Sequence, residues 1–268
     1  MKQRIKERLL KWGWFYPLKY NRITLWLRQA LPGKWRDELQ RETRFYRSFL
    51  PPCQLIFDIG AYDGHKTEAF LRLAKKVVCC EPDQHNFRIL TLRFLGLKQR
   101  VVLLNKALAA TASTLDFFSP AEGSAFNTAS AKFKSLAEST GAQKWGEEVL
   151  FPRKTAVEAD TLDNLIKTFG RPDFVKIDTE GFELDVLKGL SQPLPCLSFE
   201  CIYPEYKPEL REILSRLEGF CPEAVSFNLA FDEALLLPHF TTKENLLTFI
   251  EERQLPYFEV IARCSLPS

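Results

Sequence analysis

Residues 55–70 have the sequence LIFDIGAYDGHKTEAF. An apolar run ends at Asp58 and Gly60, and Gly64 follows where a segment with helical spacing begins. Glycine lets the backbone turn sharply, and the first turn of a helix presents free N–H groups to a ligand. The stretch therefore predicts a strand, a ligand-binding turn and a helix, the unit with which nucleotide-binding sheets begin.

Strand and helix patterns alternate through the rest of the chain. This alternation predicts a parallel sheet of about seven strands with helices on both faces, whose last two strands form an antiparallel pair. Residues 111–160 mix Ser, Thr and Ala with Phe, which favours a hairpin or loop over a site. The expected strands lie in the segments 54–60, 75–82, 100–109, 172–178, 195–205, 224–231 and 257–264.

The composition is that of an ordinary globular protein, with 268 residues, 46% hydrophobic and 26% charged. No uncharged apolar run approaches the ~20 residues that a membrane helix needs, and the N-terminus lacks the pattern of a secretory signal. The seven cysteines include no C-x-x-C pair, so we expect most of them to be reduced and to pack as small hydrophobes. These features favour the cytoplasm.

Charge divides the chain into two parts. Residues 1–50 carry 13 Lys and Arg against 4 Asp and Glu, and the remainder carries 24 against 30. We expect residues 1–52 to form a helical cap, interrupted at Pro17 and Pro32-Gly33, on a domain spanning 53–268. Its large aromatic residues are expected to pack in the core: Trp12, Trp14, Trp26 and Trp35. The alternative is a contact surface for membrane lipids, an acidic partner or the substrate; nucleic acid is disfavoured because the rest of the chain is acidic.

The turn at 60–64 excludes two classes of phosphate site. A dinucleotide site favours G-x-G-x-x-G, but Tyr62 stands where the middle glycine would be and Asp63 adds a negative charge. No G-x-x-x-x-G-K-[ST] motif occurs. The next strand ends in Glu81-Pro82, where a carboxylate accepts hydrogen bonds from both ribose hydroxyls. The two strand ends together favour a nucleoside with a cationic amino-acid part.

Three stretches carry a family resemblance: FDIGAYDGHKT (57–67), CCEPD (79–83) and PDFVKIDTEGFE (172–183). They resemble the FkbM-type family of S-adenosylmethionine-dependent methyltransferases, over roughly residues 53–205. The resemblance implies an α/β fold, with a Rossmann-like, doubly wound, seven-stranded sheet of the class I methyltransferase type and here a helical N-terminal extension. It also implies S-adenosylmethionine as cofactor and methyl transfer to a hydroxyl oxygen, often on sugars or natural products.

The resemblance also implies the residues that bind the methyl donor. Tyr62 departs from the Gly-Ala-Asn-x-Gly turn of many relatives, while Glu81 and Pro82 take the ribose position. Asn105 to Ala107 would flank the adenine. The methionine part would be held by the turn and the residues near it: Asp58, Gly60, Ala61, Tyr62, Asp63, Gly64, Thr67 and Asp178.

A second acidic group lies at later strand ends. Asp178 ends one strand, Glu180 lies in the following turn, and Glu200 ends the next strand. Each can act as a base toward a hydroxyl acceptor, and Asp178 or Glu180 can instead bind the ammonium group of the donor. Mg²⁺ is an alternative ligand of three such acids, but we do not favour it because no histidine completes a familiar set, and we predict no metal site.

The sequence thus predicts a methyltransferase acting on a hydroxyl of a small molecule or glycan. The alternative function is a binding or scaffold protein that has kept the fold and lost catalysis. His65, just after the glycine turn, is expected to be a solvated loop residue. The acceptor, the oligomeric state and the acid that acts as base are not determined by these patterns.

Overall fold

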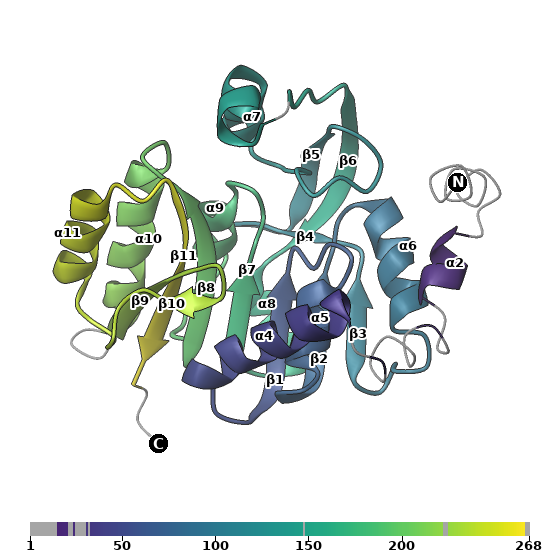
Figure 1. Cartoon of the computed structure of the whole chain (residues 1–268), viewed down its shortest axis with the longest axis horizontal. Coiled ribbons are helices and arrows are strands. Elements are labelled where there is room, and N and C mark those ends of the chain that lie inside the picture. The colour runs from purple at the N-terminus through teal and green to yellow at the C-terminus, as the bar shows by residue number, and fades with distance from the viewer. Residues whose placement is uncertain are drawn as a thin grey trace.

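The computed structural model describes residues 15–20, 24, 31, 33–146, 148–221 and 225–265. Its main sheet has the strand order β10-β9-β11-β8-β7-β1-β2-β3 (Figure 1). The neighbouring strands β8, β7, β1, β2 and β3 are parallel to one another, and β11 is antiparallel to both β8 and β9. The bounds are β1 Cys53–Ile59, β2 Ala74–Cys80, β3 Val101–Leu104, β7 Phe174–Ile177, β8 Cys196–Ile202, β9 Val225–Phe231, β10 Ala234–Leu235 and β11 Tyr257–Cys264.

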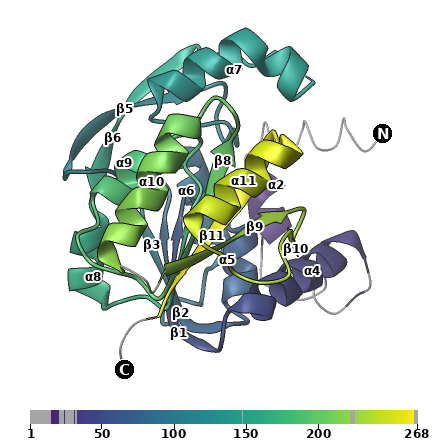
Figure 2. The same ribbon diagram turned by 90° about the vertical axis from the view of Figure 1, so that its left-hand side faces the viewer.

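Helices cover both faces of this sheet (Figure 2). Side chains alternate along a strand, so Ile56 of β1 packs with one face and Phe57 with the other. The first face is covered by α4 Lys34–Phe49, α5 His65–Phe70 and α6 Gln84–Arg93. The second is covered by α8 Leu162–Phe169, α9 Glu183–Lys188, α10 Lys207–Phe220 and α11 Lys243–Arg253. The predicted doubly wound, Rossmann-like fold is confirmed, with the two-residue β10 as an addition at the edge.

A second, smaller sheet stands above the carboxyl ends of the main strands (Figure 1). Its order is β4-β6-β5, with β4 at Ala107–Leu108, β5 at Ser113–Ser119 and β6 at Arg153–Asp160. β5 and β6 pair in antiparallel fashion, and α7, Ala131–Lys144, lies between them in the sequence. The single strand predicted over 100–109 is therefore wrong: the chain leaves the main sheet after Leu104, and Ala107 pairs with β6 instead.

The N-terminal part is described only in pieces. α2, Phe15–Tyr20, includes Pro17 within its first turn, so the predicted interruption there is wrong. A proline is tolerated at that point because the first N–H groups of a helix need no partner in the helix. Trp12, Trp14 and Trp26 lie outside the described residues, and Trp35 is half-buried at the start of α4.

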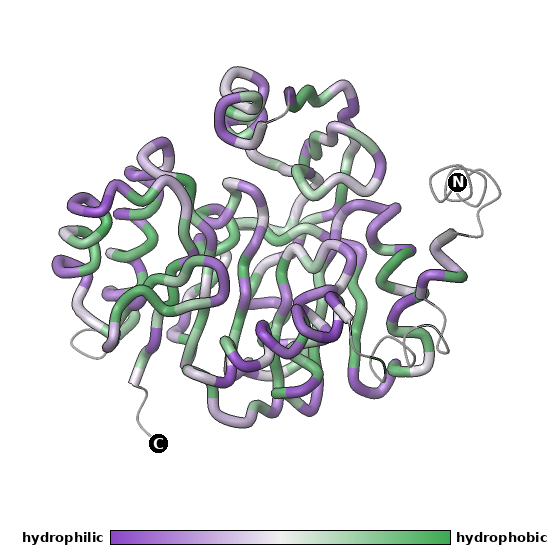
Figure 3. The backbone as a smooth tube through the Cα atoms, viewed as in Figure 1, coloured by the Kyte–Doolittle hydropathy of each residue, from purple (hydrophilic) through white to green (hydrophobic). Residues whose placement is uncertain are grey.

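α4 consists mainly of hydrophilic residues (Figure 3), and its buried residues include the aromatic Phe45, Tyr46 and Phe49. Its Tyr46 and Phe49 are buried and pack against Phe70 of α5 and Phe174 of β7. Burial of large aromatic side chains dominates the energetics of such a contact. α4 is thus packed on the sheet from the side that also carries the glycine turn.

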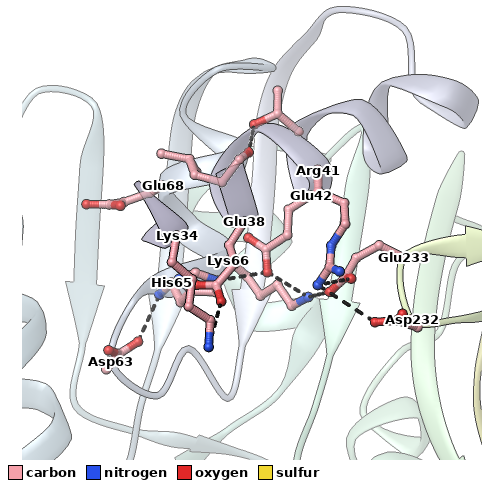
Figure 4. A network of polar contacts seen from close by, with 12 residues as sticks. Lys34, Glu38, Arg41, Glu42, Asp63, His65, Lys66, Glu68, Asp232 and Glu233 are labelled. Atoms are coloured by element: carbon pink, nitrogen blue, oxygen red, sulfur yellow. Dashed lines mark hydrogen bonds and ion pairs between the residues drawn. The ribbon is translucent and has the colours of Figure 1, made fainter. Parts of the chain in front are cut away.

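Charged side chains tie α4 to α5 and to the turn between β9 and β10 (Figure 4). Glu42, almost fully buried, pairs with His65 Nε2 and with Lys66 Nζ, each at 3.0 Å. Arg41 pairs with Glu233 at 2.9 Å. The Glu42 hydrogen bond raises the pKa of His65, so the expected solvated histidine is in fact an ion-paired one.

Five cysteines are free and buried, as expected, while Cys221 and Cys264 form a disulfide that no spacing pattern predicts. Within the described residues, no helix is both long and apolar enough to span a membrane.

Candidate functional site

A cleft opens at the carboxyl ends of β1, β2 and β7, beneath the smaller sheet. The loop between β5 and α7 lines it from above, with Ser124, Ala125 and Asn127. The cleft brings together seven of the predicted site residues: Gly60, Tyr62, Glu81, Pro82, Ala107, Asp178 and Glu180.

Gly60 is required by the close approach of two strand ends. Its φ is +81°, and a Cβ atom there would lie 1.7 Å from the backbone oxygen of Asp178. Because this clash is with a backbone atom, no side-chain rotation could relieve it. The glycine therefore lets the β1 turn and the β7 turn meet and form one wall of the cleft.

Glu81 is held by the backbone on both of its oxygens. Oε2 accepts from the N–H of Tyr62 and Oε1 from the N–H of Asp83, each at 2.8 Å. A carboxylate has about four lone-pair sites, so two remain for a ligand. Burial raises the pKa of Glu81 to about 8. Tyr62 itself has a φ of +49°, a left-handed conformation that is uncommon for residues other than glycine and asparagine and is strained for a tyrosine.

Four predicted donor-binding residues do not line the cleft but support the glycine turn: Asp58, Ala61, Gly64 and Thr67. Thr67 Oγ1 donates to Asp58 Oδ2 at 2.5 Å, and both side chains are buried. Burial raises the pKa of Asp58 to about 6. The backbone oxygen of Ala61 accepts from the N–H of Gly64 at 2.8 Å, which closes the turn.

Asn105 and Asp63 also face away from the cleft. The Asn105 amide donates to the backbone oxygens of Glu81 and Pro82, at 2.8 and 3.1 Å, and so fixes the end of β2. The Asp63 carboxylate forms an ion pair with Arg93 at 3.0 Å. Its negative charge is therefore neutralised within the protein, and Gly60 and Tyr62 are the residues of the turn that line the cleft.

Lys176 organises the acidic cluster at the ends of β7 and β8. Its side chain is 1% exposed, and its Nζ lies 2.6 Å from Asp178 Oδ2 and 3.5 Å from Glu200 Oε1. Although burial opposes the charge, Asp178 and Glu200 hold the pKa of Lys176 well above its usual value. The ammonium group thus stands between the two acids, and Glu200 lines a separate pocket beside Tyr206.

Glu180 lies on the cleft side of this cluster. Its φ is +53°, and its backbone oxygen accepts from Thr128 Oγ1 at 2.7 Å. Burial, followed by the charge of Asp178, raises the pKa of Glu180 well above its usual value. A cation in the cleft would favour the ionised form, because opposite charge lowers a carboxyl pKa.

Sequence reasoning missed Glu183, which holds the loop after β7. Its Oε1 accepts from the Thr179 N–H at 2.9 Å and from the Gly181 N–H at 3.2 Å. Burial raises its pKa to about 7. A glutamate just after a glycine turn, at the first residue of a helix, is a sequence signal for such a contact.

Two asparagines of the cleft wall were also missed. Asn86 is 1% exposed, and its Oδ1 is buried without a hydrogen-bond partner among the described residues. The same holds for both Oδ1 and Nδ2 of Asn127. Buried polar atoms are nearly always hydrogen-bonded, so these amides are suited to a ligand with donors and acceptors on its edge. Single asparagines in DQHNF and AFNTAS carry no sequence signal for this role.

The raised pKa values predict how stability depends on pH. The folded state binds protons at Glu81, Glu183 and Asp58 more tightly than the unfolded state, so their stabilising contribution is complete below their ordinary pKa values and is lost as pH rises through about 6 to 8. We expect the melting temperature of the ligand-free protein to fall between about pH 6 and about pH 8.5. Glu200→Gln should reduce this fall, because burial raises that pKa too.

Differential scanning calorimetry across this pH range checks the expectation. Glu158→Gln, at an exposed carboxylate, is the matched control and should keep the wild-type fall. A melting temperature that stays level or rises with pH would contradict the assignment of protonated buried acids.

A metal centre finds no support in the described part of the chain, where no group of three or more His, Cys, Asp or Glu side chains is placed to hold an ion. Lys176 already supplies a positive charge between Asp178 and Glu200.

The solved structures to which this chain is similar share little sequence with it. Similar solved structures include a precorrin-6y C5,15-methyltransferase of Geobacter metallireducens, at 10% identity and a TM-score of 0.41, covering 85% of this chain and 86% of that one. An rRNA methylase of Streptococcus thermophilus has 12% identity and a TM-score of 0.41, covering 83% and 93%. A protein in the NADB-Rossmann superfamily of Streptococcus agalactiae has 10% identity and a TM-score of 0.42, covering 89% and 72%.

No curated protein matches the sequence significantly. The methyltransferase FkbM domain matches residues 58–221, a stretch that contains the glycine turn, Glu81 and the acidic cluster. Because this match spans more than half of the chain, the protein belongs to the FkbM family of S-adenosylmethionine-dependent methyltransferases.

Proposed function

We propose that this protein transfers the methyl group of S-adenosylmethionine to a hydroxyl oxygen of a sugar, glycan or natural product. The observation that carries the proposal is the position of Asp178. Asp178 lines the same cleft as Glu81, and Lys176 donates to one of its carboxylate oxygens at 2.6 Å. A carboxylate fixed beside a donor site suits an acceptor that loses a proton as it attacks.

The residues of the cleft fit the donor in three places. Glu81 has lone pairs for the two ribose hydroxyls. Ala107, Leu108 and Phe117 form an apolar wall for the base, and the amides of Asn86 and Asn127 can pair with its polar edge. Asp178 and Glu180 place negative charge at the other end. Bound there, S-adenosylmethionine supplies an electrophilic methyl group on a positively charged sulfur.

The protein would contribute alignment and proton transfer. The turns of β1 and β7 meet at Gly60 and fix the cleft wall, which serves to hold the acceptor oxygen in line with the methyl group. Asp178 would take the hydroxyl proton as the oxygen attacks. Lys176, 1% exposed, would keep the carboxylate in place.

Methyl transfer to a panel of acceptors tests this function. The purified protein is incubated with S-adenosylmethionine carrying a ¹³C methyl group and with monosaccharides, disaccharides, hydroxylated aromatics and hydroxy-lactones, with amines, thiols and RNA alongside. We expect a methoxy ¹³C resonance on a hydroxyl acceptor. Transfer to nitrogen, sulfur or carbon would contradict O-methylation, and donor binding without transfer to any member would favour the non-catalytic binding protein.

A further inference from the structure

Asp63 faces the N-terminal helix α2 and not the cleft. Its Oδ2 accepts from the hydroxyl of Tyr20 at 2.9 Å. Its Oδ1 pairs with Arg93 at 3.0 Å and accepts from the N–H of His65 at 3.1 Å. Three protein donors thus converge on one carboxylate in the middle of the glycine turn.

Arg93 clamps the same turn from α6. Its side chain is 1% exposed, and its Nη1 also donates to the backbone oxygen of Asp63 at 2.6 Å. Its Nη2 pairs with Glu68 at 3.0 Å, and its guanidinium group lies 5.3 Å from the centre of the Tyr20 ring. A buried guanidinium with several donors in a fixed geometry holds its partners more rigidly than a flexible ammonium would.

α2 packs closely on α6 and can therefore support the glycine turn. Tyr20 is 2% exposed and packs with Ile89 of α6. Tyr16, one turn earlier, meets the His85 ring edge-on with centroids 5.0 Å apart. Figure 1 shows α2 lying along α6, beyond the end of the sheet.

The contacts of Tyr20 and Arg93 with Asp63 are connected to the cleft through the backbone. Asp63 directly follows Tyr62, whose N–H holds Glu81 at 2.8 Å. The residues on either side of Asp63 both have left-handed backbone, with φ of +49° at Tyr62 and +81° at Gly64. At Tyr62, which is not a glycine, this conformation is strained and persists only where its surroundings fix it. Moving Asp63 would move the Tyr62 N–H away from Glu81.

We propose that Tyr20 and Arg93 are positioning residues that hold the donor-binding turn through Asp63, so that the N-terminal segment forms part of the donor site. This inference rests on the assignment of the cleft to S-adenosylmethionine. It gives the basic N-terminal segment a role in binding a small molecule, although none of its described residues lines the cleft.

The test is the affinity for S-adenosylhomocysteine, measured by isothermal titration calorimetry well below the melting temperature of every variant. Tyr20→Phe should weaken binding about 3- to 10-fold, because the loss of one hydrogen bond loosens the turn while the contacts of Glu81 with the ligand remain. Asp63→Asn should weaken binding at least as much. The variant that combines Tyr20→Phe with Asp63→Asn should bind S-adenosylhomocysteine with the same affinity as Asp63→Asn alone. Tyr203→Phe, which removes a tyrosine hydroxyl beside Lys207 and outside the cleft, is the matched control and should keep wild-type affinity.

Arg93→Lys gives an independent measurement if Tyr20→Phe does not fold, and it should also weaken binding. Unchanged affinity in the folded variants, even with a lower melting temperature, would mean that the contact only stabilises the fold and would overturn the inference. Additive losses in the double variant would also contradict it, because they would show that Tyr20 does not act through Asp63. If the wild-type protein itself fails to bind S-adenosylhomocysteine, the donor assignment fails first and this inference with it.

Discussion

Replacing Asp178 with Asn is expected to lower the rate of methyl transfer by about 100- to 10,000-fold, the usual contribution of a general base. The amide keeps the size of the side chain but cannot take a proton from the acceptor. Affinity for S-adenosylhomocysteine should change far less, because Glu81 and the wall at Ala107 and Phe117 remain. Rates are measured on any acceptor that the ¹³C panel identifies.

A control variant and a contrary outcome make the Asp178 result specific. Asp116→Asn, on the exposed side of β5, is the control and should keep the wild-type rate. If Asp178→Asn retained full activity, the base would have to be another acid, and Glu180 would be the remaining carboxyl of the β7 turn that lines the cleft.

Glu81→Ala is expected to weaken binding of S-adenosylhomocysteine about 100-fold or more. Two hydroxyl hydrogen bonds to a carboxylate are lost, each worth about 1.5–3 kcal/mol, and every 1.4 kcal/mol is tenfold in affinity. The N–H groups of Tyr62 and Asp83 also lose their acceptor, which loosens the turn. Isothermal titration calorimetry measures the change directly.

Glu81→Gln separates ribose binding from support of the turn. It keeps one acceptor oxygen and the side-chain volume, so the fold should be retained, while the amide N–H₂ group faces a backbone donor. We expect an affinity loss of at least tenfold here as well. Glu122→Ala, at an exposed carboxylate, is the control. An unchanged affinity in both Glu81 variants would remove Glu81 from the donor site.

The main sheet could be predicted because its strands are short apolar runs that end at Gly, Glu or Asp. The separation of β3 from β4 could not, since VVLLNKAL is apolar on both sides of Asn105 and no local pattern marks where a chain changes sheets. α11, Lys243–Arg253, was missed between the two strands whose antiparallel pairing is confirmed.

The site shows a different limit. Strand ends locate backbone positions correctly, so Gly60, Glu81 and Asp178 meet at one cleft. The direction of each side chain depends on tertiary contacts: Asp58 turns inward to Thr67, and Asp63 turns outward to Tyr20. Thr67 is 9 residues from Asp58 along the chain and Tyr20 is 43 residues from Asp63, and no sequence pattern marks either contact.

A crystal structure with S-adenosylhomocysteine tests the central claim most directly. We expect both ribose hydroxyls within hydrogen-bond distance of the Glu81 carboxylate, the base between Ala107 and the loop carrying Asn127, and the sulfur on the side of Asp178 and Glu180. Binding outside this cleft, for example in the polar groove beside Arg88 and Arg153, or a ribose that makes no contact with Glu81, would contradict the assignment of the donor site.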